Sequence, residues 1–136
     1  VDTVGNTANP DRTANPDNLY FSDKMRTLFI GEDSGTHVNN FVWAYNVDTG
    51  KLSRILSLPA GAEATGLSVV ENLNGHAYIM SNNQHPGDWI GSMPATLMDA
   101  LKAEAAAMYG TSDKYPAVLN YYLDANVGYI GGIPGL

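Results

Sequence analysis

The chain contains no cysteine and few basic residues. With no Cys among 136 residues, neither a disulfide nor a thiolate metal ligand lies within this sequence. Seven Lys and Arg stand against 14 Asp and Glu, which gives a net charge of −7. A nucleic-acid surface needs clustered Lys and Arg to neutralise phosphates, so the composition argues against nucleic acid as a partner. The acidic balance suits hard cations, or simply solubility.

Long apolar runs and the common catalytic motifs are also missing. No stretch is apolar enough to cross a bilayer, and no secretory signal or lipidation motif is present, so we expect no membrane span. The phosphate-binding loop, the His-Glu-x-x-His zinc motif and the Gly-x-Ser-x-Gly nucleophile motif do not occur. At roughly 40 residues per blade, the chain is too short for a six-bladed propeller. Val rather than Met at position 1 favours processing or truncation.

Short apolar segments with alternating polarity dominate residues 15–82. Turns rich in Gly, Asn and Asp separate them, which is typical of antiparallel strands. The predicted strands are 19–22, 27–31, 39–47, 52–57, 65–70 and 76–81. The first four form one meander and the last two begin a second. The pattern therefore predicts a mostly β fold with about two antiparallel blades of a partial six-bladed β-propeller.

The last third has a different character. Apolar residues recur there at helical spacing, at Leu97, Met98, Leu101, Ala105 and Met108. This predicts a helix over 94–109 with Gly110 as its C-cap. Residues 115–122 fit a short helix or a strand, and the Gly- and Pro-rich stretch 126–136 is expected to be a tail. The predicted division is a loop over 1–14, two propeller-like meanders over 15–90, and a helix and tail over 91–136 that packs on the rest of the propeller or a partner chain.

Acidic residues at strand ends are the main candidates for a metal site. Glu63 lies between small residues and just before a buried strand, so its carboxylate can reach a central ion. Glu32 and Asp33 are adjacent at a strand end, where they repel each other unless a cation or Arg lies between them. For each of these acids the alternative is a solvated turn residue.

Two further turns carry candidates of other kinds. Asp17 and Asn18 lie in an Asn-Pro-Asp-Asn turn, where they either bind a metal through oxygen or only stabilise the turn. His85 and Gln84 lie before Pro86 and could bind a phosphate group, although a lone His beside Pro is more often structural.

Five segments resemble the PhoX-type alkaline phosphatases, the secreted family formerly called domain of unknown function 839. They are NPDNL (15–19), GED (31–33), WAY with DTGK (43–45 and 48–51), GAEATG (61–66) and QHPG (84–87). Their order and spacing are similar to the last part of that family's propeller. The resemblance covers a little over half of the chain.

The resemblance implies part of a metal-dependent phosphatase in the periplasm or outside the cell, acting on small phosphate monoesters. It implies calcium and iron as cofactors, and it assigns Glu63, Glu32, Asp33, Asp17 and Asn18 to the metal cluster. The cysteine expected to bind iron and an Arg-Pro-Glu element are missing, and Asn18 stands where the family usually has Gly. The remaining blades would come from the same protein or another chain. The alternatives are a structural or assembly subunit and a calcium-dependent propeller lactonase.

Overall fold

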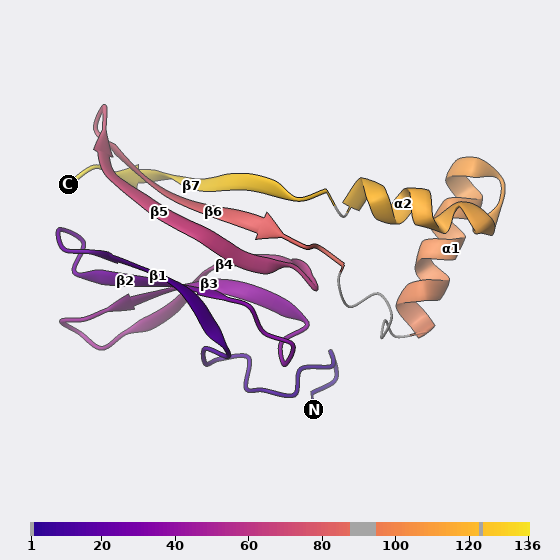
Figure 1. The fold of residues 1–136 in the computed structure, drawn as a ribbon, viewed down its shortest axis with the longest axis horizontal. Coiled ribbons are helices and arrows are strands. Elements are labelled where there is room, and N and C mark those ends of the chain that lie inside the picture. The colour runs from indigo at the N-terminus through magenta and orange to yellow at the C-terminus, as the bar shows by residue number, and fades with distance from the viewer. Residues whose placement is uncertain (1, 88–94, 123) are drawn as a thin grey trace.

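The computed structural model describes residues 2–87, 95–122 and 124–136. The protein is mostly β, as predicted, with two antiparallel sheets and two short α-helices (Figure 1). Residues 2–15 contain neither helix nor strand, in agreement with the predicted N-terminal loop.

The first sheet is the predicted four-stranded meander. Its strands are β1 (Pro16–Ser22), β2 (Thr27–Glu32), β3 (Asn39–Asn46) and β4 (Leu52–Ala60), in the spatial order β1-β2-β3-β4. Successive antiparallel pairs such as Tyr20 with Phe29 and Phe29 with Ala44 fix the register. Short connections allow each strand to pair with the next one along the chain.

The second sheet contains a strand that the sequence did not predict. It consists of β5 (Glu63–Leu73), β6 (His76–Gln84) and β7 (Asn126–Pro134), in that order. The Gly-rich stretch 126–136 is therefore not a loose tail, because most of it pairs with β6 from Asn83–Asn126 to His76–Pro134. Its strand conformation is stabilised by this long-range pairing rather than by local propensity.

The helices form a pair between β6 and β7. They are α1 (Ala95–Tyr109), the short 3₁₀ helix η2 (Ser112–Lys114) and α2 (Tyr115–Tyr122), so the second segment is a helix and not a strand. Leu101 and Ala105 are buried against Val118, as the helical spacing predicts. Met108 is 58% exposed, so the prediction that it packs in this core is wrong. The side chain of Leu97 and the whole of Pro94 lie outside the part of the chain that the structure describes.

The helix pair projects from one end of the sheets (Figure 1). No helix in the described parts of the chain combines the length and apolar character needed to cross a bilayer.

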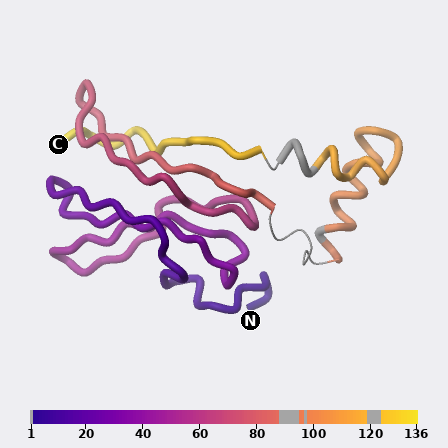
Figure 2. Tube along the Cα trace, in the orientation of Figure 1, coloured from indigo at the N-terminus to yellow at the C-terminus, as the bar shows by residue number. Residues whose placement is uncertain are grey.

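The two sheets pack face to face around a shared apolar core. Phe29 of the first sheet is buried with Val69 and Ile79 of the second. The tube in Figure 2 shows β5 running alongside the first sheet, and β5 contacts β1, β2 and β3. Within the described residues the sheets do not close into a barrel or a propeller.

Candidate functional site

One end of the two sheets collects the residues that the sequence proposed. Pro16 at the start of β1 pairs with Glu32 at the end of β2, which brings Asp17 to the same end as Glu32. In the second sheet, Glu63 at the start of β5 pairs with Gln84 at the end of β6. Antiparallel pairing thus places the first residues of one strand beside the last residues of the next in both sheets. We call this end the strand-end site.

Two close approaches join the halves of the strand-end site. The backbone N–H of Gly66 in β5 donates to Oδ1 of Asn18 in β1 at 3.2 Å. Gly31 of β2 lies so close to Ala64 of β5 that an added Cβ would come within 2.1 Å of the Ala64 carbonyl oxygen. Glycine at position 31 is therefore what lets the first sheet touch β5 at this end.

Asn18 is a structural connector between the sheets. Its Oδ1 accepts from Gly66, and its Nδ2 donates to Oδ2 of Asp17 at 2.6 Å. A glycine at position 18 could make neither bond. Asp17 is exposed. Asp17 keeps acceptor capacity for a cation, whereas the Asn18 oxygen is already used.

Glu32 is fully buried and has a full set of hydrogen-bond donors. Its Oε1 accepts from the indole Nε1 of Trp43 at 2.7 Å and from the backbone N–H of Ala14 at 2.8 Å. Its Oε2 lies 3.0 Å from Nδ1 of His37 and accepts from the backbone N–H of Phe41, also at 3.0 Å. These four contacts offset the cost of burying a carboxylate.

The geometry argues against the expected metal role of Glu32. Both of its oxygens point to protein donors, and a metal ion would have to displace at least one of them. Asp33 is exposed, so only Glu32 of the adjacent pair faces inward, and it does so toward His37 rather than toward a shared cation. The mutual repulsion that the sequence suggested is avoided because the two side chains lie in different environments.

Sequence reasoning missed His37 as the partner of Glu32. The ring is buried, and its Nε2 lies 3.2 Å from the carbonyl oxygen of Asn9 in the N-terminal loop. His37 also packs edge to face on Phe41, with ring centroids 5.5 Å apart. No sequence signal indicates this pairing, because a separation of five residues across a loop has no regular geometry.

The other candidate side chains differ in burial and in hydrogen bonding; they are Glu63, Gln84 and His85. Glu63 is half-buried at the first position of β5. Gln84 accepts a hydrogen bond from the Thr65 hydroxyl at 2.8 Å, which fixes its amide. His85 is exposed, with a φ of 47°, and the buried Pro86 and Gly87 follow it. A side chain so exposed can reach a ligand at the surface, but nothing in the described structure orients the ring.

The donor set at the strand-end site suits calcium better than iron. Asp17, Asp33 and Glu63 provide hard oxygen ligands, which Ca²⁺ binds, and no thiolate is available for iron. A calcium ion takes 6–8 oxygens. Within the described residues no three His, Asp or Glu side chains are grouped closely enough to hold a metal ion. These carboxylates are of the chemical type that calcium binds, but the described residues do not bring three of them together.

Several acids outside this set have lowered pKa values. The side chain of Asn6, with backbone N–H groups of the same loop, lowers the pKa of Asp2 to about 2. Hydrogen bonds from Arg26 lower the pKa of Asp48, and the Ser22 hydroxyl lowers that of Glu71. In each case the donors favour the ionised form, so these acids stabilise turns and strand contacts.

Comparison of the chain with known protein families, with curated proteins and with solved structures finds no match.

Proposed function

We propose that this chain forms two neighbouring blades of a metal-dependent phosphatase propeller acting on small phosphate monoesters in the periplasm or outside the cell. Glu63, Asp17 and Asp33 would supply oxygen ligands to calcium at the strand-end site. His85 and Gln84 would lie beside the phosphate group. The remaining ligands, including any for iron, would come from further blades, because this sequence contains no cysteine.

The observation that carries the proposal is the junction of β1 and β5. Each is the first strand of its unit and lies at an edge of its sheet, and the two edges are joined by the hydrogen bond from Gly66 to Asn18. Neighbouring blades of a propeller meet in this way, with their first strands nearest the axis. Acids at the starts of β1 and β5 would then face the same central region. The sequence resemblance to PhoX-type phosphatases supports the same arrangement.

The chemistry available to these residues is limited and specific. When bound, calcium would neutralise the phosphate oxygens and position them. Glu63 would then act as a ligand rather than as a proton donor. Gln84 holds its amide toward Thr65 and is already oriented before any substrate binds. The exposed His85 could donate a hydrogen bond to a phosphate oxygen.

A metal and activity measurement on the assembly that contains this chain tests the proposal. Calcium and iron would be measured by mass spectrometry, and hydrolysis of p-nitrophenyl phosphate would be followed by absorbance. We expect Glu63→Gln to lower calcium content and to reduce the rate at least tenfold, with the thermal transition nearly unchanged. The matched control is Glu71→Gln, the same substitution near the other end of β5, which should leave metal content unchanged.

The competing role is structural. It is favoured by the full hydrogen bonding of Glu32 and by the use of Asn18 as a connector between sheets. Absence of metal and of hydrolysis in the purified assembly would support this role and overturn the phosphatase proposal. Calcium without iron and without phosphate release would point instead to the lactonase type of chemistry.

A further inference from the structure

The first sheet carries apolar side chains on the face that points away from the second sheet. Tyr20, Phe29 and Ala44 pair across its strands and face the second sheet. Because side chains alternate along a strand, their neighbours in sequence point to the opposite, outer face. Two cross-strand rows occupy this outer face, Leu19–Ile30–Trp43–Arg54 and Phe21–Leu28–Tyr45–Leu52. Leu19 is 61% and Phe21 47% exposed, so this apolar face is open to solvent.

Arg54 is the one charged residue in these rows, and it adds little net charge to the face. Its guanidinium carbon lies 5.1 Å from the centre of the Phe41 ring, and its Nη2 donates to Oδ1 of Asp11 at 3.3 Å. Stacking and ion pairing thus already occupy this cation. The face therefore suits an apolar partner rather than one that binds through charge.

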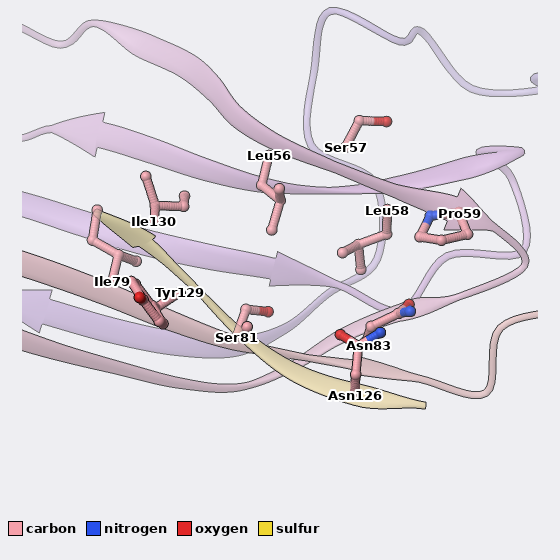
Figure 3. A pocket seen from close by; sticks show the side chains of 11 residues that line it. Leu56, Ser57, Leu58, Pro59, Ile79, Ser81, Asn83, Asn126, Tyr129 and Ile130 are labelled. Carbon is pink, nitrogen blue, oxygen red and sulfur yellow. The ribbon is translucent and has the colours of Figure 1, made fainter. Parts of the chain in front are cut away.

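The second sheet has an apolar outer face of its own. Ile79 and Ile130 line the space between the sheets together with Leu56 (Figure 3). The residues that alternate with them on the outer face are Tyr78, Met80, Val127 and Tyr129. Tyr129 is 71% exposed, and its ring packs edge to face on Tyr78 with ring centroids 5.6 Å apart. The strands β5, β6 and β7 contain no Lys or Arg.

Strands that are apolar on both faces are typical of a sheet that lies between two other layers. A sandwich with solvent on both sides instead alternates apolar inward residues with polar outward ones. The chain itself shows what packs on such a face, because Phe29 of the first sheet is buried against Val69 and Ile79 of the second. The partner that fits each outer face is therefore another antiparallel sheet.

We propose that the outer face of the first sheet binds the outer face of the second sheet of another copy of this chain, head to tail. This contact repeats the one between the two sheets within a single copy, so that every sheet lies between two others. Contact between two first sheets would bring Arg54 of both copies to one interface, whereas the second sheet contributes no like charge. Contacts between unlike faces close into a ring when the rotation between copies allows it.

The size of the faces favours a ring over a simple pair. With about six residues per strand, about 3.3 Å per residue and about 4.8 Å between strands, four strands cover roughly 400 Å². A stable interface buries about 800 Å² on each partner. One contact between two copies is therefore weak, and a ring holds each copy through both of its outer faces.

The number of copies rests on the proposed function. Two blades per copy make a six-bladed propeller from three copies, which act as the further blades for one another. No copy contributes a cysteine, so the ring offers only oxygen and nitrogen ligands from its Asp, Glu, Asn, Gln and His side chains.

Light scattering on the 136-residue chain tests the association. We expect a mass of three times 14.5 kDa that falls toward 14.5 kDa on dilution. A chain that stays at 14.5 kDa at every concentration would overturn the proposal. A ring with another number of copies would support the packing and contradict the six-bladed function. A ring without metal or hydrolysis would likewise support the packing and overturn the phosphatase alone.

Two variants distinguish head-to-tail packing from contacts between like faces. Phe21→Glu places a charge on the outer face of the first sheet, and Tyr129→Glu does so on the second. In head-to-tail packing each variant alone is monomeric, but the two pair when mixed, because each supplies the face that the other lacks. Isotope-labelled Tyr129→Glu should then show amide chemical shift changes at Leu28 and Tyr45. The control is Met108→Glu, at an exposed position in α1, which should assemble like the wild type.

The outcome of mixing decides the arrangement. Association of either folded variant alone, or no shift changes on mixing at millimolar concentration, would overturn head-to-tail packing. Circular dichroism checks that each variant is folded. Leu19→Glu and Val127→Glu change exposed positions on the same two faces, and they replace the first pair if either of its members does not fold.

Discussion

Nδ1 of His37 lies 3.0 Å from Oε2 of Glu32, and both side chains are completely inaccessible to solvent. The pair joins the end of β2 to the loop before β3, and the contact of His37 with Asn9 extends it to the N-terminal loop. Ala14 donates to the same carboxylate. One buried carboxylate therefore organises three separate backbone segments beside the strand-end site.

Replacing Glu32 by Gln should destabilise the fold by about 3 kcal/mol. The amide NH₂ of Gln would face two of the four donors that now point at the carboxylate, and these donors would be left unpaired. Urea unfolding followed by tryptophan fluorescence measures the change, because Trp43 is one of the donors.

The neighbouring substitution Asp33→Asn serves as the control. Asp33 is exposed, so this change should alter the free energy of unfolding by no more than about 0.5 kcal/mol. A Glu32→Gln protein as stable as the wild type would contradict the structural role, and loss of bound metal in that stable protein would restore Glu32 as a ligand.

Gly31→Ala should loosen the contact between the sheets. The added Cβ would come within 2.1 Å of the Ala64 carbonyl oxygen, which is backbone and cannot move aside without shifting β5. We expect a loss of about 2 kcal/mol or more in unfolding free energy, measured by urea denaturation. Gly35→Ala adds the same methyl group in open space and should be nearly neutral. Equal stability of the two variants would show that β5 does not press on β2 at Gly31.

The strands of the first sheet could be predicted from the sequence because each is bounded by turn residues and pairs with its neighbour. Both the alternation and the turn chemistry are local properties. β7 could not be predicted in this way. Its glycines lower its local strand preference, and its partner β6 lies more than 40 residues earlier in the chain.

The candidate site was also predictable only where local sequence patterns decide the structure. The sequence predicted acids at strand ends, and the antiparallel register pairs the start of β1 with the end of β2 and the start of β5 with the end of β6. The sequence could not predict that Glu32 is buried while Asp33 is exposed, because the burial of Glu32 depends on its contacts with Trp43 and His37, which lie in other segments.

The contact between Ser22 and Glu71 should make stability depend on pH. The Ser22 hydroxyl donates to Oε1 of Glu71 at 2.6 Å, and Lys24 lies 3.4 Å from the other oxygen. The hydroxyl first, and Lys24 next, lower the pKa of Glu71 below its ordinary value of 4.5. A lowered folded-state pKa gives stability that is present above about pH 4.5 and is lost as the pH falls through the folded value.

Ser22→Ala should therefore be less stable than the wild type at pH 6, by a margin that narrows at pH 3. Thermal unfolding at a series of pH values measures this margin. Some loss should remain at pH 3, because Ser22 also accepts a hydrogen bond from the backbone N–H of Met25. The exposed Ser112→Ala provides the control and should show no such trend. A margin independent of pH would mean that the hydroxyl does not favour ionised Glu71.

The helix pair should unfold locally before the sheets do. Leu101, Ala105 and Val118 form a small core of their own, with Tyr115 packed against it, and among the described residues this cluster includes none from either sheet. Regions with few buried apolar contacts open more readily than the main core.

Val118→Ala removes two methyl groups from this cluster and should lower the free energy of unfolding of the helix pair by about 1–2 kcal/mol. Hydrogen exchange should then speed up roughly tenfold in α1 and α2, while amides of β2 and β6 keep their protection. Val69→Ala is the matched control, because Val69 lies in the core shared by the two sheets and its truncation should lower protection in both of them. If Val118→Ala instead weakened protection in β6 and β7 as strongly as in the helices, the helix pair would be part of the same cooperative unit as the sheets.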